Sequence, residues 1–325
     1  MYTTQELRSL FLDYMQQHNF QFEPKELFEP VDYILQLGGK RLRPVLVLMS
    51  HNLYQPEVKT ALSAAYAYEI FHNFSLVHDD IMDEAPLRRG KATIHQKYDI
   101  NTGILSGDVM LIYAYKYLLE TADKSLVPDL MTLFSKVATE VCIGQQYDMN
   151  FETSSSITIA AYLQMIEYKT ASLIAGALQT GAILAGAPKE DLYHIYEFGR
   201  NLGIAFQLQD DILDTYGNAA TFGKRIGGDI VQNKKTYLVL QAMQLANDRQ
   251  KKVLEDLLST YPKDEEAKIT AVVAIFDALD IKSIANEKKE VYHQKALEHL
   301  AAVKVEEKRK IHLQGIAKGL LVRVK

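Results

Sequence analysis

The chain has 325 residues, and 48% of them are hydrophobic, which is enough to bury a sizeable core in one or two domains. Its 36 basic and 41 acidic residues give a net charge near -5, which provides no general attraction to nucleic acid or to an anionic membrane. A single cysteine, Cys142, excludes an intrachain disulfide, and no signal-like or membrane-spanning stretch is found, so we expect a cytoplasmic protein without nucleic-acid partners.

Apolar residues recur at three- and four-residue spacing, which predicts an all-α fold without strand pairs. No linker or low-complexity tract interrupts this pattern, so residues 1–325 are expected to form a single domain of packed helices. The predicted helices, in chain order, are residues 4–17, 27–37, 43–53, 57–82, 103–122, 128–150, 157–168, 171–187, 190–214, 230–245, 249–259, 264–280, 281–303 and 304 onward.

Two short basic segments come early in the chain. The first reads GGKRLRP at residues 38–44, and the second reads LRRGK at residues 87–91. Arginine offers a planar fork to phosphate oxygens and lysine a compact charge, so both segments suit a diphosphate ligand. Each segment alone would be ordinary surface charge, but the aspartates nearby in the sequence favour the ligand interpretation.

The first aspartate-rich motif reads DDIMD at residues 79–83 and closes the long helix predicted at residues 57–82. Residues four apart share a helix face, so Asp79 and Asp83 should point together while Asp80 is turned to one side. Such a pair can hold a hard cation. The alternative is a solvated acidic helix end.

The second aspartate-rich motif reads DDILD at residues 210–214 and also closes an apolar helical run. Magnesium suits these groups, because it takes oxygen ligands and completes its shell with water and substrate phosphates. Acidic groups at a helix C-terminus oppose the helix dipole, so two such ends favour a bound cation. The predicted metal ligands are Asp79, Asp80, Asp83, Asp210, Asp211 and Asp214.

Together these segments resemble the trans-isoprenyl diphosphate synthase (polyprenyl synthetase) family. Further matching segments are GQQYD at residues 144–148, KT at 169–170, FQLQ at 206–209, GK at 223–224 and KKT at 234–236. The resemblance implies a homodimer of isoprenoid synthase fold, with helices around a deep central cavity. It also implies a magnesium cofactor, three ions per active site, for which manganese could substitute. The implied reaction is the 1′-4 condensation of isopentenyl diphosphate with an allylic diphosphate by a short-chain prenyltransferase.

The resemblance assigns roles to individual residues. The catalytic set would be Lys169, Thr170, Gln207, Asp79, Asp83 and Asp210. The diphosphate of isopentenyl diphosphate would be bound by Lys40, Arg43, His72 and Arg89. The allylic diphosphate would be bound by Arg88, Lys169, Lys224 and Lys234.

Two features depart from the family pattern. Many members carry proline two residues after the lysine–threonine pair, whereas this chain continues from Thr236 with Tyr237 and Leu238, which leaves the start of that helix open. At the C-terminus, Arg323 or Lys325 could close the site, as basic tails do in some relatives.

Two other functions use similar motifs. A class I terpene cyclase would ionise the same substrate, but it usually carries an Asn/Ser/Glu metal motif where this chain has its second aspartate-rich motif. A non-catalytic partner subunit commonly lacks one of the two motifs. The chain keeps both, which favours a synthase.

Product length is predicted from Phe74, which lies five residues before Asp79 and about 7.5 Å deeper along the helix. An aromatic side chain there would stop a growing chain, although ordinary core packing is the alternative. The next residue is Ser75, an arrangement that resembles geranylgeranyl diphosphate synthases with a single aromatic stop. We therefore predict a C20 product, with C15 farnesyl diphosphate as the alternative and Phe71 and Tyr68 as deeper stops.

Overall fold

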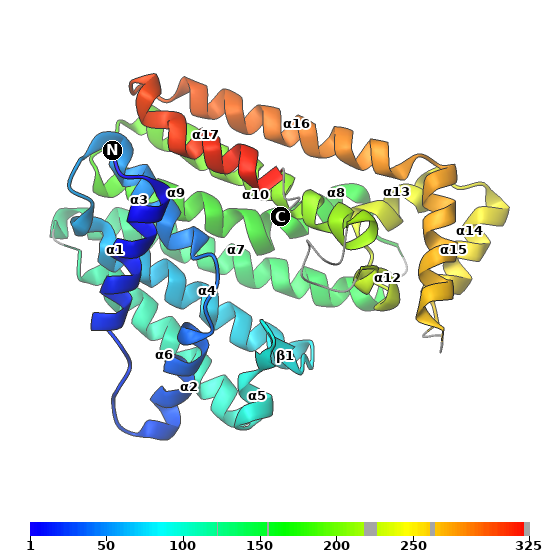
Figure 1. The fold of residues 1–325 in the computed structure, drawn as a ribbon, viewed down its shortest axis with the longest axis horizontal. Coiled ribbons are helices and arrows are strands. Elements are labelled where there is room, and N and C mark those ends of the chain that lie inside the picture. Colours follow the sequence, from blue (N-terminus) through cyan, green and yellow to red (C-terminus); the bar gives the residue numbers. More distant parts are fainter. Residues whose placement is uncertain (122, 155, 218–225, 261–263, 322–325) are drawn as a thin grey trace. The chain divides into compact units, whose positions relative to one another are not determined.

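Helices form most of the computed structural model, which confirms the all-α fold expected from the apolar spacing (Figure 1). The structure describes residues 1–121, 123–154, 156–217, 226–260 and 264–321. Along these residues no helix has both the length and the apolar character needed to cross a membrane.

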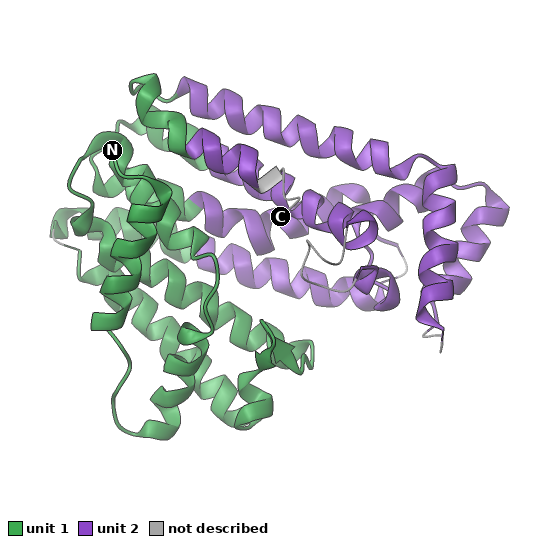
Figure 2. Ribbon diagram, viewed as in Figure 1, with its two compact units in different colours: residues 1–136, 176–196, 303–312 green, residues 137–175, 197–302, 313–325 purple. Residues whose placement is uncertain are grey.

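The described chain divides into two compact units, coloured separately in Figure 2. Unit 1 contains residues 1–136, 176–196 and 303–312, and unit 2 contains residues 137–175, 197–302 and 313–325. Four helices contribute residues to both units: α7 (Val127–Thr153), α9 (Ser172–Leu184), α10 (Lys189–Tyr216) and α17 (Glu307–Leu321). The single domain expected over residues 1–325 stays a prediction.

Unit 1 holds the N-terminal elements. They are α1 (Thr4–Gln17), α2 (Lys25–Gln36), α3 (Leu42–Tyr54), a 3₁₀ turn (Val58–Ala61), α4 (Leu62–Met82), β1 (Leu87–Arg88), β2 (Lys91–Ala92), α5 (Ile94–Lys97), α6 (Ile100–Leu119) and a 3₁₀ turn (Lys124–Leu126). A capping box between Thr3 and Glu6 starts α1. Helices α4 and α6 approach closely at Gly107, where a Cβ atom would lie 2.2 Å from His78 Nε2.

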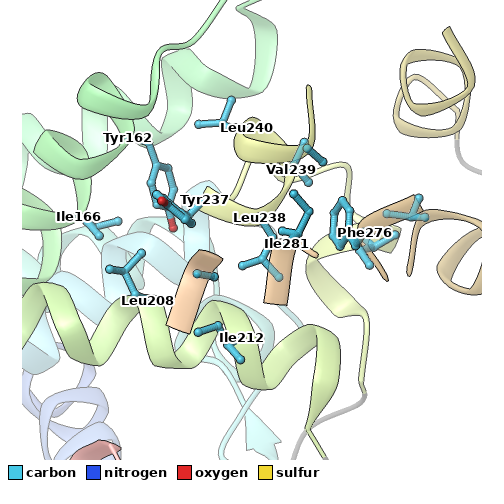
Figure 3. Close-up of a cluster of buried hydrophobic side chains, with 14 of the residues drawn as sticks. Tyr162, Ile166, Leu208, Ile212, Tyr237, Leu238, Val239, Leu240, Phe276 and Ile281 are labelled. Atoms are coloured by element: carbon cyan, nitrogen blue, oxygen red, sulfur yellow. The ribbon is translucent and has the colours of Figure 1, made fainter. Parts of the chain in front are cut away.

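Unit 2 is organised around a cluster of buried apolar side chains (Figure 3). Its remaining elements are α8 (Ile159–Ile166), a π-helical turn (Glu167–Ala171), α12 (Gly228–Val231), α13 (Tyr237–Leu245), α14 (Asp248–Leu258), α15 (Glu265–Ala278) and α16 (Ile281–Ala302). The cluster joins α8, α10, α13, α15 and α16 through Tyr162, Ile166, Leu208, Ile212, Tyr237, Leu238, Val239, Leu240, Phe276 and Ile281. Burial of this surface fixes α8 beside α10, the helix that carries the second aspartate motif.

The expectation of no strand pairs is wrong at one point. Strands β1 and β2 pair antiparallel, with Leu87 opposite Ala92 and Arg88 opposite Lys91. The turn residues Arg89 and Gly90 both have positive φ, at 54° and 75°, as in the tight hairpins that suit the twist of paired strands. A strand of two residues leaves no apolar alternation, so the pattern of hydrophobic residues could not indicate it.

The continuous helix predicted at residues 230–245 is also wrong. The chain forms α12, leaves the helical path, and begins α13 at Tyr237 after an extended Thr236. Asn233 takes a positive φ of 59° at this break. The Lys268 ammonium donates to the Val231 carbonyl at 3.4 Å and also to the Asn233 side chain, so a tertiary contact replaces the hydrogen bonds of a continued helix.

Candidate active site

The first aspartate motif lies at the C-terminal end of α4, in unit 1. Asp79 is partly exposed and Asp83 is exposed. The Asp83 N–H donates to the Asp79 carbonyl at 2.8 Å, which keeps the two residues one helical turn apart. Their spacing is therefore the one that the sequence predicted for a shared face.

The middle aspartate of this motif is buried and paired. Asp80 is only 1% exposed, and Arg88 donates to both of its carboxylate oxygens, from Nε at 2.7 Å and from Nη2 at 2.6 Å. Two parallel charge-assisted bonds of this kind are strong and directional. They tether the β1–β2 hairpin to the end of α4, so Asp80 supports the neighbouring basic segment.

The hairpin turn brings the second basic segment against the first. Arg89 Nη1 donates to the Gly38 carbonyl, and the guanidinium lies over Gly39, where a Cβ atom would be 2.9 Å from Cζ of Arg89. Gly38 and Gly39 have φ angles of 81° and 124°, which side chains rarely allow. Gly39 therefore permits the close approach of Arg89 to the loop that carries Lys40, and Gly38 supplies a positive φ to the same loop.

Arg43, in the first turn of α3, meets His72 on α4, with Nη1 3.2 Å from His72 Nε2. Because a guanidinium N–H can only donate, Nε2 accepts and the ring proton lies on Nδ1. Burial, followed by the charges of Arg43 and Arg89, lowers the pKa of His72 well below its ordinary value. His72 is thus neutral at pH 7.

Burial disfavours the charged form of two arginines beside this loop. Burial lowers the pKa of Arg43 to about 10. The charge of Glu69 opposes this lowering, and the charge of Arg89 adds to it. Burial and the charge of Arg41 also lower the pKa of Arg89. A lowered guanidinium pKa means that the surroundings disfavour the cation, and a bound anion would reverse this effect.

Sequence reasoning did not assign any role to Arg41 or Glu69. Both are buried, at 4% and 2% exposure, and Arg41 Nη1 lies 2.5 Å from Glu69 Oε1. The signal available was a lone acidic residue inside the apolar run of α4, three residues before His72.

The residues predicted to limit product length lie along α4. Phe74 is 8% exposed, and its ring centroid lies 5.4 Å from that of Phe71 and 4.9 Å from that of His78. Deeper in unit 1, Phe134 lies 5.2 Å from Phe71 and 5.4 Å from Tyr68. These side chains form a continuous aromatic column. The Ser75 hydroxyl donates to the carbonyl of His72 at 2.9 Å within the helix.

The second aspartate motif ends α10, in unit 2, and its middle residue is again buried. Asp211 is 3% exposed, accepts from the Tyr162 hydroxyl, and lies 3.3 Å from Gln207 Nε2. Burial raises the pKa of Asp211 to about 8, with the Tyr162 hydrogen bond opposing the rise. Asp210 is partly exposed, whereas Asp214 is 8% exposed and accepts from the Asp229 N–H at 3.0 Å.

Lys169 and Thr170 lie in the π-helical turn between α8 and α9. Such turns are rare and often mark functional positions. Lys169 Nζ contacts Asp148 of α7 at 2.6 Å, and the Thr170 hydroxyl donates to Gln207 at 3.3 Å. Gly144 permits this packing, since a Cβ atom there would lie 2.2 Å from the Lys169 nitrogen. The structure thus brings three matching segments of the sequence together.

The remaining predicted cations differ in what the structure shows. Lys234 is exposed and 3.8 Å from Asp229, while its neighbour Lys235 donates to the Phe151 carbonyl at 2.8 Å near the end of α7. Lys224, Arg323 and Lys325 lie outside the described residues, so their predicted roles stay predictions.

The aspartates fit magnesium as partial ligand sets. Among the residues that the structure describes, no three His, Cys, Asp or Glu residues lie close enough to form a metal cage. Each motif instead offers carboxylates near the end of a helix, and magnesium is commonly bound by one or two carboxylates together with substrate phosphates. The donor set therefore suits a metal that arrives with a diphosphate.

Known proteins resemble this chain over most of its length. The sequence model of the polyprenyl synthetase family matches residues 24–276. A short chain isoprenyl diphosphate synthase of Methanocaldococcus jannaschii is 37% identical over 244 residues, which are 75% of this chain and 74% of that protein. A geranylfarnesyl diphosphate synthase of Natronomonas pharaonis is 38% identical over 275 residues, covering 79% of this chain and 78% of that protein.

Solved structures give the same assignment. A crystal structure of a geranylgeranyl pyrophosphate synthase is 43% identical, covers 100% of both chains and superposes with a TM-score of 0.95. The expected family and enzyme class are thereby confirmed. The chain belongs to the polyprenyl synthetase family and is a short-chain prenyl diphosphate synthase.

Proposed function

We propose that this chain condenses isopentenyl diphosphate with an allylic diphosphate to give mainly C20 geranylgeranyl diphosphate. The observation that carries the substrate assignment is the gathering of basic side chains at the loop of residues 38–41, where Arg89 lies over Gly39 and Arg43 follows in the first turn of α3. Arg43 and Arg89 both have lowered pKa values in this loop region. A diphosphate would bring negative charge to these two guanidinium groups and accept hydrogen bonds from both.

The isopentenyl diphosphate site is proposed to comprise Lys40, Arg43, His72 and Arg89. Arg89 donates to the Gly38 carbonyl, two residues before Lys40, and Arg43 donates to His72. Neutral His72 holds the Arg43 guanidinium through Nε2, which orients that cation for a ligand.

Metal binding is proposed for Asp79, Asp83 and Asp210, with magnesium or manganese as the ion. When bound, the metal would neutralise charge on the diphosphate leaving group. The sequence also placed Asp80, Asp211 and Asp214 in the metal set. Their contacts with Arg88, Tyr162 and the Asp229 N–H support a role in orienting the helix ends. Three ions per active site remains the expectation from the family resemblance.

The chemistry requires no side-chain nucleophile. The carbon–oxygen bond of the allylic diphosphate breaks, the double bond of isopentenyl diphosphate attacks the allylic carbon, and a proton is lost to the released diphosphate. We propose that Arg88, Lys169, Lys224 and Lys234 hold the departing diphosphate. Thr170 and Gln207, joined by a hydrogen bond, would face the developing cation.

Product length is proposed from the aromatic column of α4. Phe74 is its first ring below Asp79, and Phe71 lies directly against it, so the column offers a floor to a growing chain. The C20 length is proposed because a single aromatic residue is followed by Ser75, as in the geranylgeranyl diphosphate synthases that the sequence resembles. Chromatography of products formed from isopentenyl diphosphate with C5, C10 and C15 starters tests this directly. We expect mainly C20. A C15 or C25 product would contradict the length assignment, and cyclised hydrocarbons or no product would contradict the synthase assignment.

We also propose a cytoplasmic homodimer. Exposed apolar side chains on α6 support a subunit interface, with Ile104 at 42%, Ile112 at 64% and Leu119 at 47% exposure. Their spacing of eight and seven residues places them on one face of the helix. Burial of such a stripe against a second copy would remove apolar surface from water.

A further inference from the structure

We propose that Glu69 is a positioning residue for isopentenyl diphosphate, acting through a buried ion pair with Arg41. The inference rests on the proposed function of the loop at residues 38–41. Glu69 itself would not touch the substrate. It would fix the backbone from which Lys40 and Arg43 reach the diphosphate.

Arg41 occupies the turning point of this loop. It is the residue that precedes α3, and its backbone is left-handed, with φ 51° and ψ 40°. Lys40 comes directly before it, and Arg43 lies in the first turn of the helix directly after it. A residue other than glycine adopts this conformation at a cost, so other contacts must hold it there.

The side chain of Arg41 supplies those contacts. Its Nη1 binds Glu69 on α4, and its Nη2 donates to the Leu35 carbonyl near the end of α2. Asn73, one turn after Glu69, donates to the same carboxylate oxygen at 3.0 Å and to the Glu69 carbonyl at 2.8 Å. The Arg41 side chain thus connects the end of α2 and the start of α3 to the buried Glu69 carboxylate in the middle of α4.

Both partners of the Arg41–Glu69 contact are charged and buried. Burying an ion pair is expensive, and an apolar pair of similar size is often equally stable, so stability alone does not explain the pair. Directional bonds do what apolar contacts cannot, because they fix the orientation of the Arg41 side chain and of its backbone. Glu69 is followed three residues later by His72, the partner of Arg43. The same face of α4 therefore contacts both Arg41 and Arg43.

The test compares four variants by isothermal titration with isopentenyl diphosphate and, separately, farnesyl diphosphate. Glu69→Gln removes the charge but keeps an acceptor for Asn73. Glu69→Asp keeps the charge. The double variant Arg41→Met/Glu69→Leu replaces the ion pair by apolar side chains. The control Asp191→Asn alters another fully buried carboxylate of unit 1, which binds Tyr54 and the Lys304 N–H and lies outside the proposed site.

We expect Glu69→Gln to weaken isopentenyl diphosphate binding about tenfold or more, as for a lost charge-assisted contact, and farnesyl diphosphate binding less than about twofold. Glu69→Asp should recover part of the loss. The double variant should remain as stable as the wild type while its isopentenyl diphosphate binding stays weak. Asp191→Asn should lower the thermal midpoint without changing either affinity.

Two results would overturn the inference. Normal isopentenyl diphosphate binding by a folded Glu69→Gln protein, or by the double variant, would show that the pair does not position the site. Equal weakening of both ligands would show a general structural effect. If the wild-type protein does not bind isopentenyl diphosphate, the proposed function itself fails, and the two failures are thereby distinguished.

Discussion

The two aspartate motifs share a sequence pattern but differ in how their middle residues are held. In unit 1, the charged guanidinium of Arg88 donates to both carboxylate oxygens of Asp80. In unit 2, Asp211 accepts from the neutral groups of Tyr162 and Gln207. Burial raises the pKa of Asp211 to about 8, as expected where no cation compensates a buried carboxylate.

This difference separates two tasks within one short motif. Asp79, Asp83 and Asp210 retain exposure to solvent, which a metal ligand needs, whereas Asp214 at the end of the second motif is buried. The middle aspartates are buried and tie the helix end to a neighbouring element. A motif match therefore identifies the segment, while the contacts of each carboxylate indicate which residue serves which task.

The largest expected effect comes from removing an outer aspartate. Asp79→Ala and Asp210→Ala should each lower kcat about 100- to 1,000-fold, because each removes a ligand for the ion that stabilises the leaving group. Steady-state assays across a magnesium titration would measure this. Near-normal turnover in both folded variants would show that these residues do not bind the metal.

Removing the first ring of the aromatic column should lengthen the product. Phe74→Ala should shift the distribution to C25 or longer and cost about 3 kcal/mol of unfolding free energy, as expected for an emptied aromatic site. Product chromatography and urea unfolding provide the measurements. An unchanged product in a folded, active variant would place the floor at another residue. Tyr115→Leu is a suitable control, because this ring contacts Phe134 but not Phe74.

The basic set of unit 1 should affect one substrate selectively. Arg43→Ala and Arg89→Ala should raise the KM for isopentenyl diphosphate about ten- to a hundredfold, since a lost charge-assisted bond is worth about 1.5–3 kcal/mol. The KM for the allylic substrate should change little. Arg200→Ala, which breaks the pairs with Glu197 and Glu167 in unit 2, is the matched control. Selective weakening of the allylic substrate would reverse the site assignment.

The middle aspartates offer a direct comparison of the two motifs. Asp80→Asn should cost about 2 kcal/mol of unfolding free energy, because it leaves the Arg88 guanidinium without its counter-charge. Asp211→Asn keeps an acceptor for a neutral donor and should cost about 1 kcal/mol. Urea denaturation would compare both with Glu287→Gln, an exposed acid on α16. Equal costs would remove the distinction between a charged and a neutral tether.

The smallest expected effect is on the pH dependence of stability. The pKa of His72 is lowered in the folded protein, so below its ordinary value of 6.5 the unfolded chain binds a proton that the folded protein rejects. The His72 contribution to stability is therefore complete above pH 6.5 and declines as the pH falls below it. His72→Gln should show a shallower loss of unfolding free energy between pH 7.5 and 5.5. Parallel curves for variant and wild type would exclude this contribution.

The sequence predicted the helices well where apolar spacing and capping agree. Residues 4–17 are one example, because the Thr3 capping box begins the helix just before its buried apolar positions Leu7 and Phe11. It failed where side chains distant in sequence decide the backbone. Lys268 interrupts the helix expected at residues 230–245, and the Arg89 hairpin depends on two positive φ angles. Neither the Lys268 hydrogen bonds nor the positive φ angles leave a periodic signal in the sequence.

The candidate site was predicted as a set of residues but not as a set of contacts. Spacing indicated that Asp79 and Asp83 share a helix face. It could not show that Arg88 binds Asp80, that Tyr162 binds Asp211, or that Glu69 holds Arg41. These partners are 8, 49 and 28 residues apart in sequence, so only folding brings them together.

Release of inorganic diphosphate tests the central claim most directly, because it reports breakage of the allylic carbon–oxygen bond by a synthase or a cyclase and is absent from a non-catalytic subunit. We predict rapid release only when magnesium, farnesyl diphosphate and isopentenyl diphosphate are all present, with one diphosphate released for each isopentenyl unit consumed. Equal release from farnesyl diphosphate alone would indicate a cyclase. No release with all three components would contradict the account of this chain as a synthase.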